Sequence, residues 1–177
     1  METDGGDWTL VWSYTFTNYG SFSTTSNAVT PRPTWDVKHP DRVDVPTSNT
    51  PPLNETDFNA IEFSNWKILG KEVLIKSNIN NWIIYSGKGS LPQWDYGNCK
   101  CRIAKSITVQ CPNGEAPAFF GRNYDCGPAY KITGGNKHYY YFDGCTGYDF
   151  PAHDPCGSLS ANELKNIQNS HGNVFIR

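Results

Sequence analysis

The ten residues W-T-L-V-W-S-Y-T-F-T, from Trp8 to Thr17, set the expected fold class of this chain. Their even positions carry large apolar side chains, whereas the odd positions are mostly Thr and Ser. A period of two is typical of a half-buried β-strand with its aromatic rings turned inward. We therefore expect a strand here, with a turn at Asp4-Gly5-Gly6-Asp7 before it.

Outward from this strand, apolar runs and loose alternation predict further short strands. They are Val73-Leu74-Ile75, Trp82-Ile83-Ile84-Tyr85, Cys101 to Cys111, Ala118-Phe119-Phe120 and Asn173 to Arg177. Short helices are expected over Thr56–Trp66 and after the capping box Ser160-Ala161-Asn162-Glu163. The stretch from Gly20 to Pro52 lacks periodicity and predicts a long surface loop, with disorder as the alternative for Asp41 to Pro52. The sequence thus predicts one strand-rich, irregular α+β domain over residues 1–177.

The composition narrows the class of protein. A chain of 177 residues is long enough for one domain with a real core. Six Trp and ten Tyr suit an extracellular or carbohydrate-facing protein better than a cytosolic enzyme. The net charge of -2 gives no electrostatic case for nucleic acid or an anionic membrane, and no apolar run is long enough to span a bilayer. The first residues hold no apolar signal-peptide core, so a secreted form would be a mature fragment.

The cysteines favour secretion. All six lie in the C-terminal half, at Cys99, Cys101, Cys111, Cys126, Cys145 and Cys156. Because paired C-x-x-C units typical of zinc sites are missing, we predict three disulfides, which would staple the long loops. Their pairing stays open, except that Cys99 and Cys101 are not expected to bond together, since side chains two apart in a strand point the same way. The sequon at Asn54 is a candidate glycosylation site.

The loop from Gly134 to Gly157 is the candidate ligand site. Its glycines and prolines forbid a long helix, and its three carboxylates predict a calcium site, because calcium takes several oxygen ligands. These carboxylates belong to Asp143, Asp149 and Asp154. A Cys145–Cys156 bridge would close the loop around them. The alternative is that each Asp simply caps its own turn.

The same loop carries side chains that suit a glycan. Sugars stack their C–H faces on aromatic rings and need oriented polar partners for their hydroxyls. The candidate ligand contacts are His138, Tyr139, Tyr141, Tyr148 and His153. The run from Tyr139 to Phe142 is also a good strand, whose alternate rings would then belong to the core. The histidines and carboxylates match no catalytic motif, so we expect a protein that binds and is not an enzyme.

Both ends of the chain resemble a known family. The opening M-E-T-D-G-G-D-W-T-L-V, Met1 to Val11, is similar to the M-x-T-D-G-G-G-W-T-L/V opening of fibrinogen-like C-terminal domains and to the matching stretch of intelectins, the X-type lectins. The ending G-N-V-F-I-R, Gly172 to Arg177, resembles the last strand of intelectins. The Trp8 strand, Leu53–Trp66 and Ile75–Trp82 also resemble cnidarian secreted fibrinogen-like proteins, including coral skeletal-matrix components.

This resemblance implies a function as well as a fold. It implies a secreted, disulfide-bonded glycoprotein of the lectin type, often calcium-dependent, that recognises extracellular glycans. The chain departs from the family pattern at Asp7, which replaces the third Gly, and it lacks the D-x-D calcium loop. Asp143-Gly144-Cys145-Thr146-Gly147 stands in place of the intelectin H-C-I-G-G-G-G run. The alternative function is a structural subunit of an extracellular matrix or filament, which would assemble into homo-oligomers.

Overall fold

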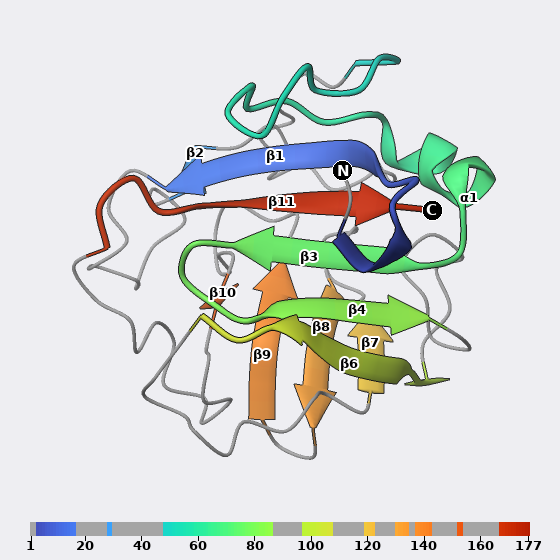
Figure 1. Ribbon diagram of the computed structural model, residues 1–177, viewed down its shortest axis with the longest axis vertical. Helices are drawn as coiled ribbons and strands as arrows, with labels where there is room; N and C mark the ends of the chain where they lie inside the picture. Colours follow the sequence, from blue (N-terminus) through green and yellow to red (C-terminus); the bar gives the residue numbers. More distant parts are fainter. Residues whose placement is uncertain are drawn as a thin grey trace, which may run out of the picture.

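A computed structural model of the chain describes residues 3–16, 28–29, 48–86, 97–107, 119–122, 130–134, 137–142, 152–153 and 167–177. This part of the protein is mostly β-structure, arranged in two antiparallel sheets (Figure 1). The strand-rich character expected from the sequence is confirmed. The helical part of the expected α+β class is small, because α1 (Trp66–Leu69) is the single α-helix within these ranges.

The larger sheet has the strand order β2-β1-β11-β3-β4-β6. Its strands are β1 (Thr9–Phe16), β2 (Ala28–Val29), β3 (Val73–Ser77), β4 (Trp82–Ser86), β6 (Lys100–Lys105) and β11 (His171–Ile176). The last strand of the chain therefore lies inside the sheet, between β1 and β3 (Figure 1). The strands predicted at both ends of the chain and at Val73 and Trp82 are confirmed.

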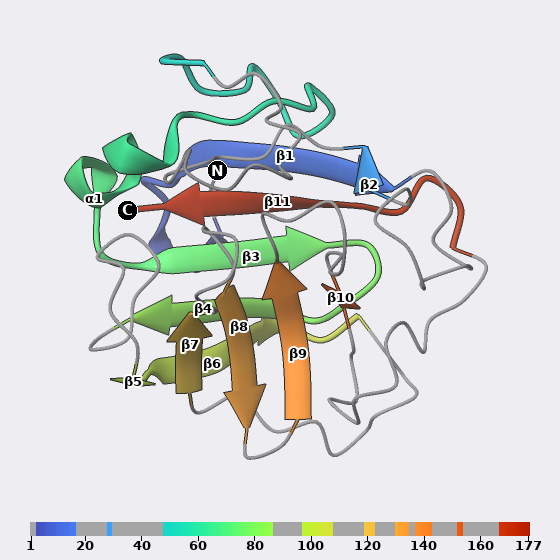
Figure 2. The same cartoon turned by 180° about the vertical axis from the view of Figure 1, so that it is seen from behind.

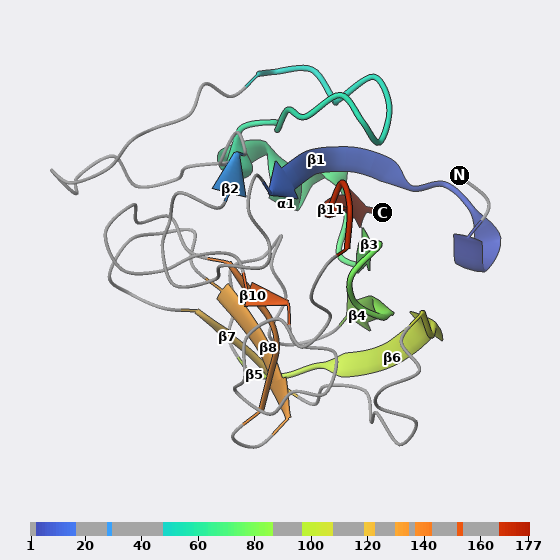
Figure 3. The same ribbon diagram turned by 90° about the vertical axis from the view of Figure 1, so that its left-hand side faces the viewer.

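The smaller sheet has the order β10-β9-β8-β7-β5. Its strands are β5 (Gly97–Asn98), β7 (Phe119–Arg122), β8 (Tyr130–Gly134), β9 (Lys137–Phe142) and β10 (Ala152–His153). It lies against one face of the larger sheet, with its strands running across those of the larger sheet (Figure 2). The opposite face of the larger sheet is turned away from the smaller one (Figure 3).

The two termini are joined by one polar cluster around Arg177. Its Nε donates a hydrogen bond to the Glu72 carboxylate at 2.7 Å, and its guanidinium carbon lies 4.3 Å from the centre of the Trp8 ring. The N–H groups of Lys71 and Glu72 donate to the Arg177 carbonyl at 2.8 and 2.9 Å. Gly5, Gly6 and Asp7 just before Trp8 all have positive φ, which explains the turn expected there.

β1 is buried on both faces, so the expectation of a half-buried strand is wrong. Val11 and Ser13 stand at odd positions, which a half-buried strand would expose, yet both are 0% exposed. A register shift between Leu10 and Trp12 marks a β-bulge. The residues before the bulge pack in one apolar cluster and Trp12 packs in the other. The apolar even positions are therefore divided between the two faces of the sheet.

The larger apolar cluster lies between the two sheets. It is formed by Val11, Trp12, Tyr14, Ala60, Ile61, Phe63, Trp66, Val73, Ile75, Ile79, Ile83, Tyr85, Tyr140, Val174 and Ile176. The smaller cluster, formed by Trp8, Leu74, Ile84 and Phe175, lies on the opposite face. Neighbours along β3 and β11 alternate between the two clusters, as the pleat of a strand requires.

The helix predicted over Thr56–Trp66 is wrong. Ala60 and Ile61 form isolated β-bridges with Trp12 and Ser48, and the chain turns helical only afterwards. A 3-10 turn at Phe63–Asn65 then leads into α1. Pairing along the edge of β1 satisfies the backbone hydrogen-bonding groups of this stretch better than an isolated helix would, because short helices are only marginally stable by themselves.

Cys99 and Cys101 form a disulfide, contrary to the expectation that they do not pair. The expectation assumed one continuous strand, but Cys99 lies between β5 and β6, where the chain leaves one sheet for the other. Their Cα atoms are 5.3 Å apart, within the range that a disulfide spans. Two residues of a flat strand would cover about 6.6 Å, so the chain bends at this point. The other four cysteines lie outside the described residues.

Tyr140 joins the two sheets through buried hydrogen bonds. Its hydroxyl donates to the Asn81 carbonyl at 2.8 Å and lies 3.2 Å from the Ser77 Oγ. Tyr140 belongs to β9, whereas Ser77 and Asn81 bracket the β3–β4 turn. Burial raises the pKa of the Tyr140 hydroxyl far above 10.0, and the Ser77 hydrogen bond offsets a small part of this effect.

We expect Tyr140→Phe to lower the free energy of unfolding by about 1–3 kcal/mol, because the Asn81 carbonyl loses its buried donor. The raised pKa adds a pH dependence. The native state holds the Tyr140 proton more tightly than the unfolded chain does, so wild-type stability should fall as the pH rises above about 10. Urea unfolding of both proteins at pH 8 and pH 10.5 measures this. An equal loss in the two proteins would contradict the role given to Tyr140.

Candidate functional site: a groove on the outer face of the larger sheet

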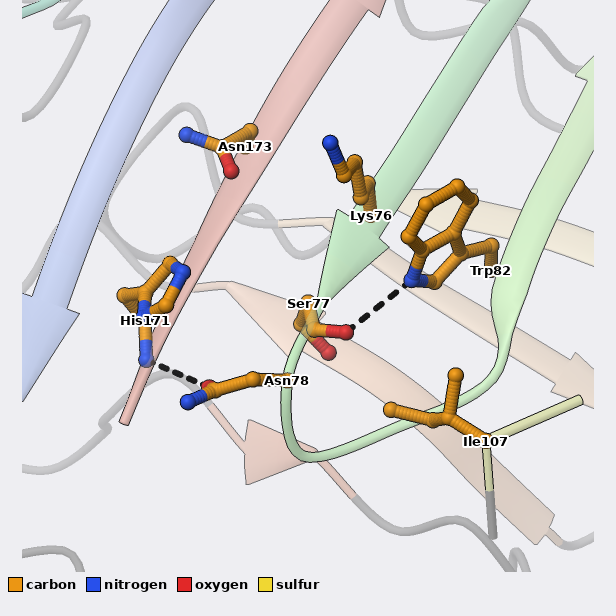
Figure 4. Close-up of a pocket in the computed structure, with 7 residues that line it drawn as sticks. All are labelled: Lys76, Ser77, Asn78, Trp82, Ile107, His171 and Asn173. Carbon is orange, nitrogen blue, oxygen red and sulfur yellow. Dashed lines mark hydrogen bonds between the residues drawn. The ribbon is translucent and has the colours of Figure 1, made fainter. Parts of the chain in front are cut away.

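A groove of about 340 Å³ lies on the larger sheet, on the side turned away from the smaller sheet. It is lined by Lys76, Ser77, Asn78, Trp82, Ile107, His171 and Asn173 (Figure 4). These residues come from β3, β4, β11, the β3–β4 turn and the chain just after β6. Three segments that are distant in sequence thus meet in one hollow.

Strand register brings the central side chains together. Asn173 of β11 is paired with Lys76 of β3, and Trp82 of β4 is paired with Lys105 of β6. Since Ile75 pairs with Ile83, Lys76 and Trp82 lie next to each other on adjacent strands. Neighbouring strands are about 4.8 Å apart, so the four residues form a row of roughly 14 Å across the sheet.

Asn173 points its amide oxygen into the groove. Its Nδ2 donates to the Ser13 Oγ at 2.8 Å and to the Glu55 carbonyl at 2.9 Å. A carbonyl only accepts, so the group that faces it must be the NH2 and not the oxygen. The residue is 1% exposed, and its orientation is fixed by these two bonds. The groove therefore presents a fixed acceptor.

His171 and Asn78 fix the end of the groove. The Asn78 Oδ1 accepts the His171 backbone N–H at 2.9 Å, and its Nδ2 donates to the Asn169 carbonyl at 3.1 Å (Figure 4). The His171 Nδ1 lies 2.6 Å from the same Asn169 carbonyl, which requires the proton on Nδ1. Asn169 has a φ of 51°, a left-handed conformation that Asn tolerates better than most residues. The Nδ1 atom is thus committed to this carbonyl, and Nε2 is the ring nitrogen that faces away from it.

Trp82 supplies the aromatic ring of the groove, and two lysine ammonium groups lie near it. Its Nε1 donates to the Ser77 carbonyl at 3.1 Å (Figure 4). The Nζ atoms of Lys76 and Lys105 lie 4.8 and 4.7 Å from the centre of its ring, within cation–π range. Lys76 also forms an ion pair with Glu55. Trp82 is half-buried and Lys105 is exposed, so ring and ammonium are both open to a ligand.

Four of the ligand contacts predicted from the sequence lie on the smaller sheet and not at this groove. His138, Tyr139 and Tyr141 lie on β9 and His153 on β10 of the smaller sheet, where Tyr141 pairs with Ala152 and Tyr140 with His153. The alternative reading of Tyr139–Phe142 as a strand is confirmed, and Tyr140 is a core ring. Tyr148, Asp143, Asp149 and Asp154 lie outside the described residues, as do the side chains of the four residues on β9 and β10.

The sequence did contain a signal for the groove. Lys76 and Asn173 are polar residues within the apolar strands V-L-I-K-S and H-G-N-V-F-I. Each lies two residues from a member of the smaller apolar cluster, Leu74 or Phe175, and so on the same face of the sheet. A polar residue in a buried strand needs a partner or a function. The strand register that places Lys76 beside Asn173 could not be read from either segment alone.

Comparisons with protein-family models, curated proteins and solved structures find no match for this chain. The chemistry of the groove is therefore the basis for a functional reading. Across the described ranges, no three His, Cys, Asp or Glu side chains gather in a way that would hold a metal ion. None of the helices in those ranges has the length and apolar character needed to cross a bilayer.

Proposed function

We propose that this chain is a recognition domain that binds glycans, and that the groove around Trp82 is one of its contact surfaces. The observation that carries the proposal is that one groove holds both the fixed Asn173 amide oxygen and the half-buried Trp82 ring, with Lys76 between them on β3. A glycan offers hydroxyl donors for the amide oxygen and C–H faces for the ring. The Lys76 ammonium group and the His171 ring add further polar groups to the lining. These groups suit hydrogen bonding to a ligand, and we assign none of them to a catalytic acid–base pair.

We further propose a secreted fibrinogen-like or X-type-lectin-like domain over residues 1–177. Asp7 supports this proposal, because its φ of 61° is the conformation that the family's third Gly would adopt readily. Asn54 remains a proposed glycosylation site. It is exposed, and its Oδ1 accepts hydrogen bonds from the Thr56 N–H at 2.9 Å and the Thr56 hydroxyl at 2.8 Å, so the sequon forms an open turn.

A calcium site in the Gly134–Gly157 loop remains part of the proposal. Its ligands would be the carboxylates of Asp143, Asp149 and Asp154, with the ring residues of the loop as a second glycan surface. The loop and the Trp82 groove make separate predictions. Binding in the loop would depend on calcium, whereas the groove residues would bind without a metal.

A matrix or filament subunit is the second candidate function. The exposed Leu53 and Ile68, 90% and 76% exposed, would favour it. Both edges of the larger sheet argue against growth by strand addition, because β2 is two residues long and β6 carries three cationic residues. Assembly would then have to use surfaces other than these edges.

We expect Trp82→Ala to reduce glycan binding at least tenfold on a glycan array, because the ring supplies the stacking surface. Ile68→Ala, an exposed residue on α1, is the control and should bind as the wild type does. Both variants are read with calcium and with a chelator. Unchanged binding by Trp82→Ala would remove the groove from the proposal, and binding lost only on chelation would move the site to the Gly134–Gly157 loop.

A further inference from the structure

Cationic side chains gather beside the groove although the whole chain is slightly acidic. The edge strand β6, K-C-R-I-A-K, has three cationic residues and no acidic one. All three, Lys100, Arg102 and Lys105, are exposed. The chain as a whole has a net charge of -2. The positive charge on this edge is therefore local and not a consequence of composition.

One ammonium group, that of Lys76 on β3, lines the groove, and that of Lys105 on β6 lies beside it. Those of Lys76 and Lys105 both lie within 5 Å of the Trp82 ring centre, at 4.8 and 4.7 Å. The Glu55 carboxylate neutralises Lys76. Lys105 has no carboxylate partner among the described residues, and it is exposed on the strand next to Trp82. Within the described part of the chain, the groove thus has the fixed acceptor of Asn173 inside it and a cation without a carboxylate partner at its edge.

We infer that the ligand of this groove is an anionic glycan, with sulfate or carboxylate groups on a sugar chain; the inference rests on the function proposed above. The anionic group binds the ammonium of Lys105, and Arg102 and Lys100 extend the contact along β6. Sugar hydroxyls donate to the Asn173 amide oxygen. An inorganic anion would use only the cations and a neutral glycan only the amide and the ring, so an anionic glycan matches both halves of the site.

Edge protection is the competing role for these cations. Charged side chains on an edge strand prevent pairing with another chain, and this role needs no ligand. It explains Lys100 and Arg102, but not why the Lys105 ammonium lies 4.7 Å from the centre of the Trp82 ring, which lines the groove. Nucleic acid is the competing polyanion, although its bases would need several exposed rings for stacking, and the row presents one.

The test measures binding of the full chain to heparin, to heparin that has been both desulfated and carboxyl-reduced so that it is uncharged, and to single-stranded DNA, by calorimetry at several salt concentrations. We expect heparin to bind best. Lys105→Gln should weaken heparin binding about tenfold and reduce the slope of log affinity against log salt by about one. The control is Lys67→Gln, an exposed lysine on α1, which should change neither quantity. Melting temperatures of both variants identify any loss of folding.

Each of the following outcomes would overturn the inference. Equal binding of heparin and its uncharged form would show that charge on the glycan is not recognised, and equal effects of Lys105→Gln and Lys67→Gln would show that it is not recognised at Lys105; glycan binding as such would stand in both cases. DNA binding as tight as heparin binding would show unspecific attraction of polyanions. A new dimer of Lys105→Gln with unchanged heparin affinity would show edge protection. The failure of every glycan to bind would remove the proposed function as well.

Discussion

Replacing Trp66 by Ala should lower the free energy of unfolding by about 3–5 kcal/mol, the usual cost of emptying a large buried aromatic site. Trp66 is fully buried in the larger apolar cluster. Its ring centre lies 5.0 Å from that of Phe63 and 6.4 Å from that of Trp12. Its Nε1 also donates to the Ile61 carbonyl at 3.0 Å. Urea unfolding followed by far-UV circular dichroism measures the loss.

Two further variants identify the cause of that loss. Trp66→Phe keeps most of the apolar volume but leaves the Ile61 carbonyl without its donor, so it should cost about 1–3 kcal/mol. Trp82→Ala removes the same kind of side chain from the half-open groove and should cost clearly less than Trp66→Ala. If both Ala variants lost equal stability, the assignment of Trp66 to the core and Trp82 to the binding surface would be wrong.

The strands were the part of the fold that the sequence could predict. Apolar runs such as Val73–Ile75 and Ile83–Tyr85 belong in strands because each residue has a buried neighbour on one face or the other. The position of the Trp8 strand was predicted correctly, but the burial of its two faces was not. A β-bulge at Leu10–Trp12 is a backbone event that leaves no mark in the spacing of apolar side chains.

Local patterns failed where distant segments compete for the same backbone. The residues Ala60 and Ile61 fit a helix by themselves, yet they bond to the edge of β1. Likewise, Cys99 and Cys101 would point the same way in a regular strand, but the change of sheet at Cys99 bends the chain between them. Both errors came from treating a segment as if its partners did not exist.

The candidate site also depends on segments that are distant in sequence, so it was harder to predict than the strands. Rings and carboxylates between Gly134 and Gly157 are conspicuous because they are adjacent in sequence. The groove residues are not adjacent: Lys76, Trp82 and Asn173 meet only because β3 lies between β4 and β11. Sequence can suggest that a lone polar residue in an apolar strand has a purpose, but only the strand register shows which residues share it.

Gly172→Ala is the second substitution with a large expected effect, about 3 kcal/mol of lost stability, at the upper end for an overpacked core. Gly172 pairs with Tyr14 across β11 and β1. A Cβ at Gly172 would overlap the hydroxyl and the far edge of the Tyr14 ring. The ring cannot move aside, because Tyr14 is fully buried and its centre lies 4.9 Å from the Trp12 ring. The measurement is the midpoint of urea unfolding.

A double-mutant cycle separates this overlap from any general intolerance of β11 to side chains. Tyr14→Leu removes the ring atoms that the new Cβ would meet, so Gly172→Ala should cost less than about 1 kcal/mol in that background. The reason is that Gly172 has no positive φ, and Ala suits a strand interior at least as well as Gly does when space is available. The same large penalty in both backgrounds would mean that Tyr14 does not occupy the space over Gly172. The contact between the Tyr14 ring of β1 and Gly172 of β11 would then be wrong.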